Sequence, residues 1–85
     1  MITITYTTSV FTAAGWRPVT ICAEAEKTSA AMARVVRVLT IDGNEPTGYT
    51  SRTGANRQRY NAAGIARREV GTRKRISACK VLAAA

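Results

Sequence analysis

Arginines and tyrosines alternate with small polar residues in the middle of the chain, where residues 48–60 read GYTSRTGANRQRY. Guanidinium, hydroxyl and amide groups contact phosphates, and exposed tyrosine rings can stack on unpaired bases. The glycines let backbone N–H groups approach a phosphate closely. The alternative is that the tyrosines belong to the core and the arginines to a solvated rim. The candidate binding residues of this segment are Arg52, Arg57, Arg59 and Tyr60.

A second basic cluster follows a few residues later, at the end of a possible helix. A cation near a helix C-terminus gains less than about 1 kcal/mol from the helix dipole, and one or two cations suffice for that role. Crowding like charges opposes folding, so a cluster this dense indicates an anionic partner. We expect its members to form one ridge: Arg67, Arg68, Arg73, Lys74 and Arg75.

The net charge of +8 is confined to the second half of the 85 residues. Residues 1–46 carry four basic and four acidic residues, whereas residues 47–85 carry nine basic residues and a single acid, Glu69. This segregation predicts a non-enzymatic module that binds nucleic acid, either DNA or RNA. One alternative is a small phage or mobile-element inhibitor or accessory protein that docks on an acidic surface of a host protein or nucleic-acid-processing complex. Another is a structural subunit of a nucleoprotein particle.

Catalytic and metal-binding patterns are weak. The chain has no histidine, the commonest general base at neutral pH. Glu24 and Glu26 would share one face of a strand, but without a third ligand they favour a solvated face over a metal site. Tyr60 has arginine neighbours, as in some DNA-breaking enzymes, which need several further groups. Cys22 and Cys79 lack metal-ligand spacing and are expected to be buried free thiols. We therefore expect no enzyme, no metal and no cofactor.

Two strands are predicted in the first part of the chain. Residues 2–11 read ITITYTTSVF and alternate apolar with hydroxyl side chains, which is typical of a half-buried strand. Residues 13–15, Ala-Ala-Gly, predict a turn. A second strand over residues 19–26 would bury Val19, Ile21, Ala23 and Ala25.

Residues 29–41 are ambiguous. An apolar stripe with a possible cap at Thr28 or Ser29 suits a helix, but the β-branched residues favour a strand, with a hairpin turn near residues 27–30. Residues 42–46, Asp-Gly-Asn-Glu-Pro, predict a firm turn. Further elements are a short strand at about 49–52, a helix over 62–70 that Asn61 can cap and Gly71 ends, and a strand over 75–83. The helix would pack through a thin stripe of Ala63, Ala66 and Val70, with Ile65 beside it.

These elements predict an α+β fold, a small antiparallel sheet of about four strands with one short helix in the C-terminal half. We expect one domain over residues 1–85, in which 1–46 form a neutral β-rich scaffold supplying most of the core and 47–85 a basic loop-helix-strand segment. The sequence has no apolar run long enough to cross a membrane and no signal-peptide pattern, so we expect a cytoplasmic protein without membrane contact. Oligomeric state stays open.

Overall fold

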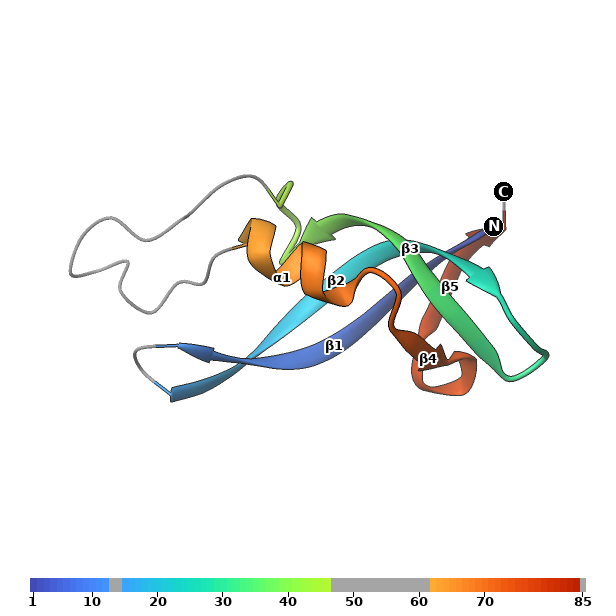
Figure 1. Ribbon diagram of the computed structural model, residues 1–85, viewed down its shortest axis with the longest axis horizontal. Coiled ribbons are helices and arrows are strands. Elements are labelled where there is room, and N and C mark those ends of the chain that lie inside the picture. Colours follow the sequence, from blue (N-terminus) through green and yellow to red (C-terminus); the bar gives the residue numbers. More distant parts are fainter. Residues whose placement is uncertain (13–14, 47–61, 85) are drawn as a thin grey trace.

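The chain forms a curled antiparallel sheet of five strands with one short helix, as the computed structural model shows for residues 1–12, 15–46 and 62–84 (Figure 1). The strands are β1 (Ile2–Thr12), β2 (Gly15–Lys27), β3 (Met32–Ile41), β4 (Arg73–Arg75) and β5 (Lys80–Ala84). The helix is α1 (Ala62–Glu69), and a 3-10 turn spans Ile76–Ala78. The fold is thus mostly β. The expected small antiparallel sheet with one short helix in the C-terminal half is confirmed. The sheet has five strands where about four were expected, because the segment predicted as one final strand over 75–83 is two strands separated by the 3-10 turn, and the fold is mostly β instead of α+β.

The sheet curls because its two edge strands are consecutive in the chain. The strand order is β4-β3-β2-β1-β5, so β4 and β5 lie at opposite edges, yet only residues 76–79 join them. Arg75 and Lys80 are five residues apart, so their Cα atoms lie at most about 18 Å from each other, and closer because residues 76–78 form a 3-10 turn. The edges must therefore approach each other, as Figure 1 shows for β4 and β5. A hydrogen bond of 2.8 Å from the Ile76 N–H to the Ala31 carbonyl holds the connecting turn against the loop before β3.

The predicted alternation of β1 and β2 is confirmed. Ile4, Tyr6 and Val10 are buried on β1, and Val19, Ile21, Ala23 and Ala25 are buried on β2. The two strands pair antiparallel with Ile4 opposite Ala23 and Tyr6 opposite Ile21. This register places the apolar side chains of both strands on the same face. A slip of one residue would turn the apolar side chains of one strand toward solvent.

Residues 32–41 form a strand, as their β-branched residues favoured, and not a helix. The preceding turn lies one residue later than predicted, and Ser29 stabilises it: its Oγ accepts hydrogen bonds from the N–H groups of Ala31 and Met32, at 3.3 and 3.2 Å. The predicted turn after β3 is confirmed too. Asp42 and Gly43 have φ of 52° and 83°, and Ile41 and Asn44 exchange backbone hydrogen bonds across them.

The helix ends as the sequence predicted, within one residue. Gly71 has φ of 88°, a left-handed conformation that glycine adopts without steric cost. Its N–H donates to the Val35 carbonyl at 2.8 Å, which leads the chain directly from α1 into pairing with β3. The predicted packing stripe is confirmed only in part: Ala66 packs against the core, as does Ile65 beside it, and the side chain of Ala63 lies outside the described residues. Ile65 and Glu69 are buried, one helical turn apart, whereas Val70 is 48% exposed.

The core comes almost entirely from the neutral half, as expected. Among the described residues, the buried hydrophobic side chains all lie in β1, β2 and β3 except Ile65, which α1 packs against this sheet. Within the described ranges, none of the helices is long and apolar enough to cross a membrane.

Candidate functional site

Pairing of β4 with β3 brings arginines from the two halves of the chain together. Arg73 lies directly opposite Arg34, and Arg75 lies opposite Met32. Arg34, Arg73 and Arg75 are all exposed, whereas Lys74, opposite the buried Ala33, is turned toward the core side. Like charges directly opposite each other on a sheet are destabilising. The pairing of Arg34 with Arg73 therefore opposes folding, and the ion pair of Arg34 with Glu26 offsets part of this repulsion.

The acidic residues of the neutral half contact arginines of the same half. Glu24 lies opposite Arg37 and Glu26 opposite Arg34, and each pair forms an ion pair, with 2.9 Å between Arg37 Nη2 and Glu24 Oε1. Glu24 and Glu26 do share one strand face, as predicted. Their carboxylates are engaged by arginines, and the part of the chain described by the structure has no group of three side chains able to hold a metal ion.

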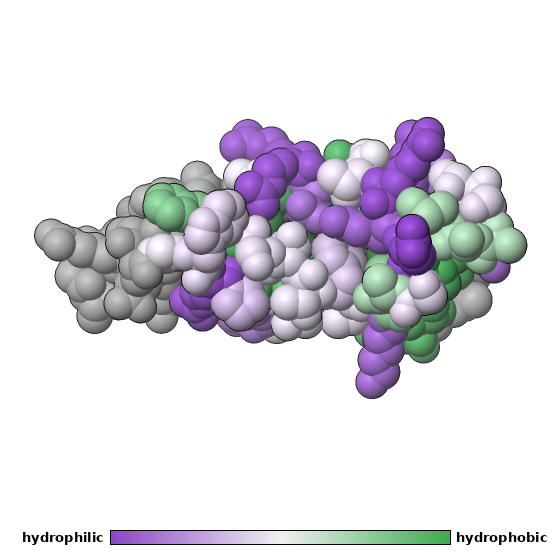
Figure 2. Space-filling view, turned by 90° about the horizontal axis from the view of Figure 1, so that it is seen from below, coloured by the Kyte–Doolittle hydropathy of each residue, from purple (hydrophilic) through white to green (hydrophobic). Residues whose placement is uncertain are grey.

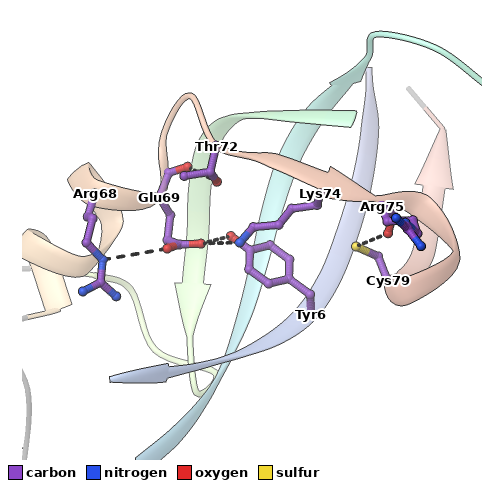
Figure 3. A network of polar contacts seen from close by, with 7 residues as sticks. All are labelled: Tyr6, Arg68, Glu69, Thr72, Lys74, Arg75 and Cys79. Atoms are coloured by element: carbon purple, nitrogen blue, oxygen red, sulfur yellow. Dashed lines mark hydrogen bonds and ion pairs between the residues drawn. The ribbon is translucent and has the colours of Figure 1, made fainter. Parts of the chain in front are cut away.

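The single acid of the C-terminal half is buried at the centre of a polar network (Figure 3). Glu69 is 5% exposed, and its Oε1 accepts a 2.7 Å hydrogen bond from the Tyr6 hydroxyl. Lys74 Nζ lies 3.1 Å from the same oxygen and 4.6 Å from the centroid of the Tyr6 ring. Arg68 Nε is 3.9 Å from Oε2. Burial, followed by this hydrogen bond and the charge of Glu69, raises the pKa of Tyr6 well above its usual value.

The five cations predicted to form one ridge therefore divide. Lys74 neutralises the buried Glu69, and Arg68 lies at the edge of that network. No described carboxylate lies within ion-pair distance of Arg67, Arg73 or Arg75, so these charges face solvent. The alternation of side chains along β4 separates Arg73 and Arg75 from Lys74. The other predicted site residues, Arg52, Arg57, Arg59 and Tyr60, lie outside the described residues, as does the predicted strand at 49–52.

The tip of the β1–β2 hairpin carries an aromatic pair that the sequence reasoning missed. Phe11 and Trp16 are opposite each other in the register, with ring centroids 5.5 Å apart and planes inclined by 71°. Phe11 is 71% and Trp16 is 73% exposed. One signal was present in the sequence: Phe11 occupies the strand face that is otherwise formed by Thr3, Thr5, Thr7 and Ser9, so it interrupts the alternation.

Hydrophobic surface gathers at the other end of the molecule. Figure 2 shows a hydrophobic area at the end where β5 and the turn between β2 and β3 lie, with strongly hydrophilic side chains at separate places beside it. Val81 and Leu82 of β5 are about half exposed. The described surface thus separates the aromatic hairpin tip from an aliphatic area at β5.

Both cysteines are free thiols, as expected, although each is half-buried and not fully buried. Cys79 Sγ donates to the Arg75 carbonyl at 3.4 Å. Burial raises the pKa of the Cys79 thiol, against the opposing effect of the Lys74 charge. Neither feature makes this thiol a reactive one, because a raised pKa keeps it protonated.

Comparison with protein-family models, with curated proteins and with solved structures found no match for this chain.

Proposed function

We propose that this protein is a non-enzymatic nucleic-acid-binding module that contacts phosphates through the exposed side of β3 and β4. Arg34, Arg73 and Arg75 form the centre of this surface, which we call the arginine face. Arg67 and Arg68 of α1 extend the set of cations. The observation that carries the proposal is the placement of Arg73 directly opposite Arg34, with no described carboxylate paired to Arg73.

The chemistry of the arginine face suits phosphate. Guanidinium groups bind phosphate oxygens through two parallel hydrogen bonds and stay charged at all physiological pH values. Arg73 and Arg75 stand about 7 Å apart along one strand face, so each can engage a separate phosphate. A bound phosphate would also balance the charge of Arg73, which no described carboxylate pairs with, whereas Arg34 already forms an ion pair with Glu26. None of these contacts reads a base, which predicts binding with little sequence preference.

Salt dependence tests the proposal. Fluorescence anisotropy of a labelled single-stranded oligonucleotide and of a short duplex should show binding at low salt that weakens steeply as salt is added. Arg73→Gln and Arg75→Gln should each lower the slope of log K against log salt by about one. Lys80→Gln is the matched control, since it removes one exposed charge from β5 and should leave affinity nearly unchanged. Absence of binding to either oligonucleotide at low salt would rule the proposal out.

Arg73→Gln should increase the stability of the free protein although it weakens oligonucleotide binding. Because Arg73→Gln removes a like-charge pair across β3 and β4 whose repulsion the Arg34–Glu26 ion pair offsets only in part, the free protein should become more stable, by at most about 1 kcal/mol. Lys80→Gln should leave stability within about 0.5 kcal/mol of the original. A binding residue whose removal stabilises the unliganded fold is the expected signature of a surface built for an anion.

The second candidate is a small accessory or inhibitor protein that binds an acidic protein surface. Half-exposed Val81 and Leu82 beside Lys80 favour it, because protein interfaces combine an apolar centre with charged surroundings. A pull-down from lysate with and without nuclease separates the two candidates. If one defined protein is retained after nuclease treatment and purified oligonucleotides do not bind, the partner is a protein and the nucleic-acid proposal is rejected.

A further inference from the structure

The β1–β2 hairpin tip carries an exposed aromatic pair, Phe11 and Trp16. We propose that Phe11 and Trp16 stack on an unpaired base, so that the nucleic acid recognised is single-stranded. This inference rests on the proposed function and deepens it, because the arginine face alone would accept single strands and duplexes alike.

The geometry presents ring surface to solvent. Each ring is more than 70% exposed, and the inclination of 71° holds the two planes apart, so that they do not cover each other by stacking. The pair is also fixed in place. Phe11 and Trp16 are partners in a β1–β2 register that runs without a break from Ile2 opposite Ala25 to Thr12 opposite Gly15. A base that binds here meets rings whose positions the strands already set.

The surroundings of the pair suit an anionic polymer. The next cross-strand pairs on the same face are Ser9 with Pro18 and Thr7 with Thr20, all exposed. This stretch offers hydroxyl groups to sugar and phosphate oxygens and includes no acid. Asp42, which lies beside Thr20, accepts a hydrogen bond from the Thr20 N–H and forms an ion pair with Arg17.

Stacking on this pair requires a base with a free face. In a duplex, both faces of an internal base are covered by neighbouring base pairs, whereas the bases of a single strand can be turned onto aromatic side chains. Such stacking tolerates any base, because every base has an aromatic face. This matches the absence of base-reading contacts at the arginine face.

Trp16 reports directly on the proposed contact, since it is the single tryptophan of the chain. Addition of oligo-dT should quench its fluorescence, and an abasic oligonucleotide of the same length and charge should bind without this quenching. A fluorescence change of equal size with the abasic strand, or with a blunt duplex, would overturn the inference of an unpaired base.

Affinity gives the second readout. Trp16→Ala should weaken oligo-dT binding by about 5- to 100-fold, the range for one stacked base, with an unchanged salt slope because no charge is lost. Leu82→Ala is the matched control: Leu82 is 51% exposed and lies on β5, which pairs with the opposite end of β1 from Phe11. Circular dichroism should show the same fold for both variants.

The outcomes separate the two proposals. If oligo-dT binds and depends on Arg73 and Arg75, but Trp16→Ala leaves affinity unchanged, base stacking is wrong and phosphate binding stands. If no oligonucleotide binds at low salt, both fail. Loss of affinity in Trp16→Ala but not in Leu82→Ala, with quenching by oligo-dT alone, supports the stacking site.

Discussion

The Tyr6 hydroxyl donates a 2.7 Å hydrogen bond to the buried Glu69 carboxylate, across 63 residues of sequence (Figure 3). Tyr6 belongs to the first strand of the neutral half, and Glu69 is the single acid of the basic half. Lys74, the middle residue of β4 between Arg73 and Arg75, completes the contact. The core and the arginine face are therefore joined through one buried carboxylate, that of Glu69.

Tyr6→Phe should lower the free energy of unfolding by about 1.5–3 kcal/mol, the usual range for a hydrogen bond to a charged group. The substitution keeps the aromatic ring and removes only the donor to Glu69. Urea unfolding followed by circular dichroism measures the change. Thr7→Ala, which alters an exposed residue of the same strand, is the control and should cost less than the Tyr6 substitution. Equal losses in the two variants would mean that the hydrogen bond contributes nothing specific.

Stability should fall at alkaline pH, and Tyr6 should cause part of that fall. Its pKa in the folded protein is raised above the ordinary value of 10.0 by burial and by Glu69. Above about pH 10 the unfolded chain releases this proton while the folded chain retains it, so rising pH favours unfolding by up to about 1.4 kcal/mol per pH unit. The contribution is fully present below pH 10. Urea unfolding at pH 8 and pH 11 should show a smaller loss for Tyr6→Phe than for the original protein.

Lys74→Gln should affect stability far more than binding, although Lys74 belongs to the basic cluster. It leaves the buried Glu69 with the Tyr6 hydroxyl and the more distant Arg68, so we expect a loss of about 1–3 kcal/mol. The salt slope of oligonucleotide binding by the folded variant should stay close to the original. Arg73→Gln provides the contrast, with the salt slope lowered and the stability of the free protein slightly increased. A reversed pattern would place Lys74 among the phosphate contacts.

Gly71→Ala should destabilise the protein by about 1–2 kcal/mol, because φ of 88° is strained for any residue with a Cβ atom. No atom lies within 4 Å of a Cβ built at this position, so the cost is one of backbone conformation and not of a clash. Gly71→Asn should cost less than Gly71→Ala, since asparagine tolerates the left-handed region better. Thermal unfolding of the two variants gives the comparison.

The sequence predicted β1, β2 and the turn after β3 because their signals are local, whereas the predicted turn at 13–15 lies largely outside the described residues. Alternation from Ile2 to Val10 sets the buried face of a strand, and Asp42 with Gly43 sets a tight turn. The strand over 75–83 was mispredicted because nothing local shows that Arg75 and Lys80 pair with different neighbours. The 3-10 turn between them is held by Ala31, which is distant in sequence.

The candidate site, too, was predictable from the sequence only in part. The sequence by itself determined that positive charge collects in the second half and that the first half supplies the core, since both follow from composition and alternation. Only the tertiary structure decided which charges face solvent. Strand pairing turned Lys74 toward Glu69 and set Arg73 against Arg34, because neighbouring residues of a strand point to opposite faces and long-range register chooses their partners.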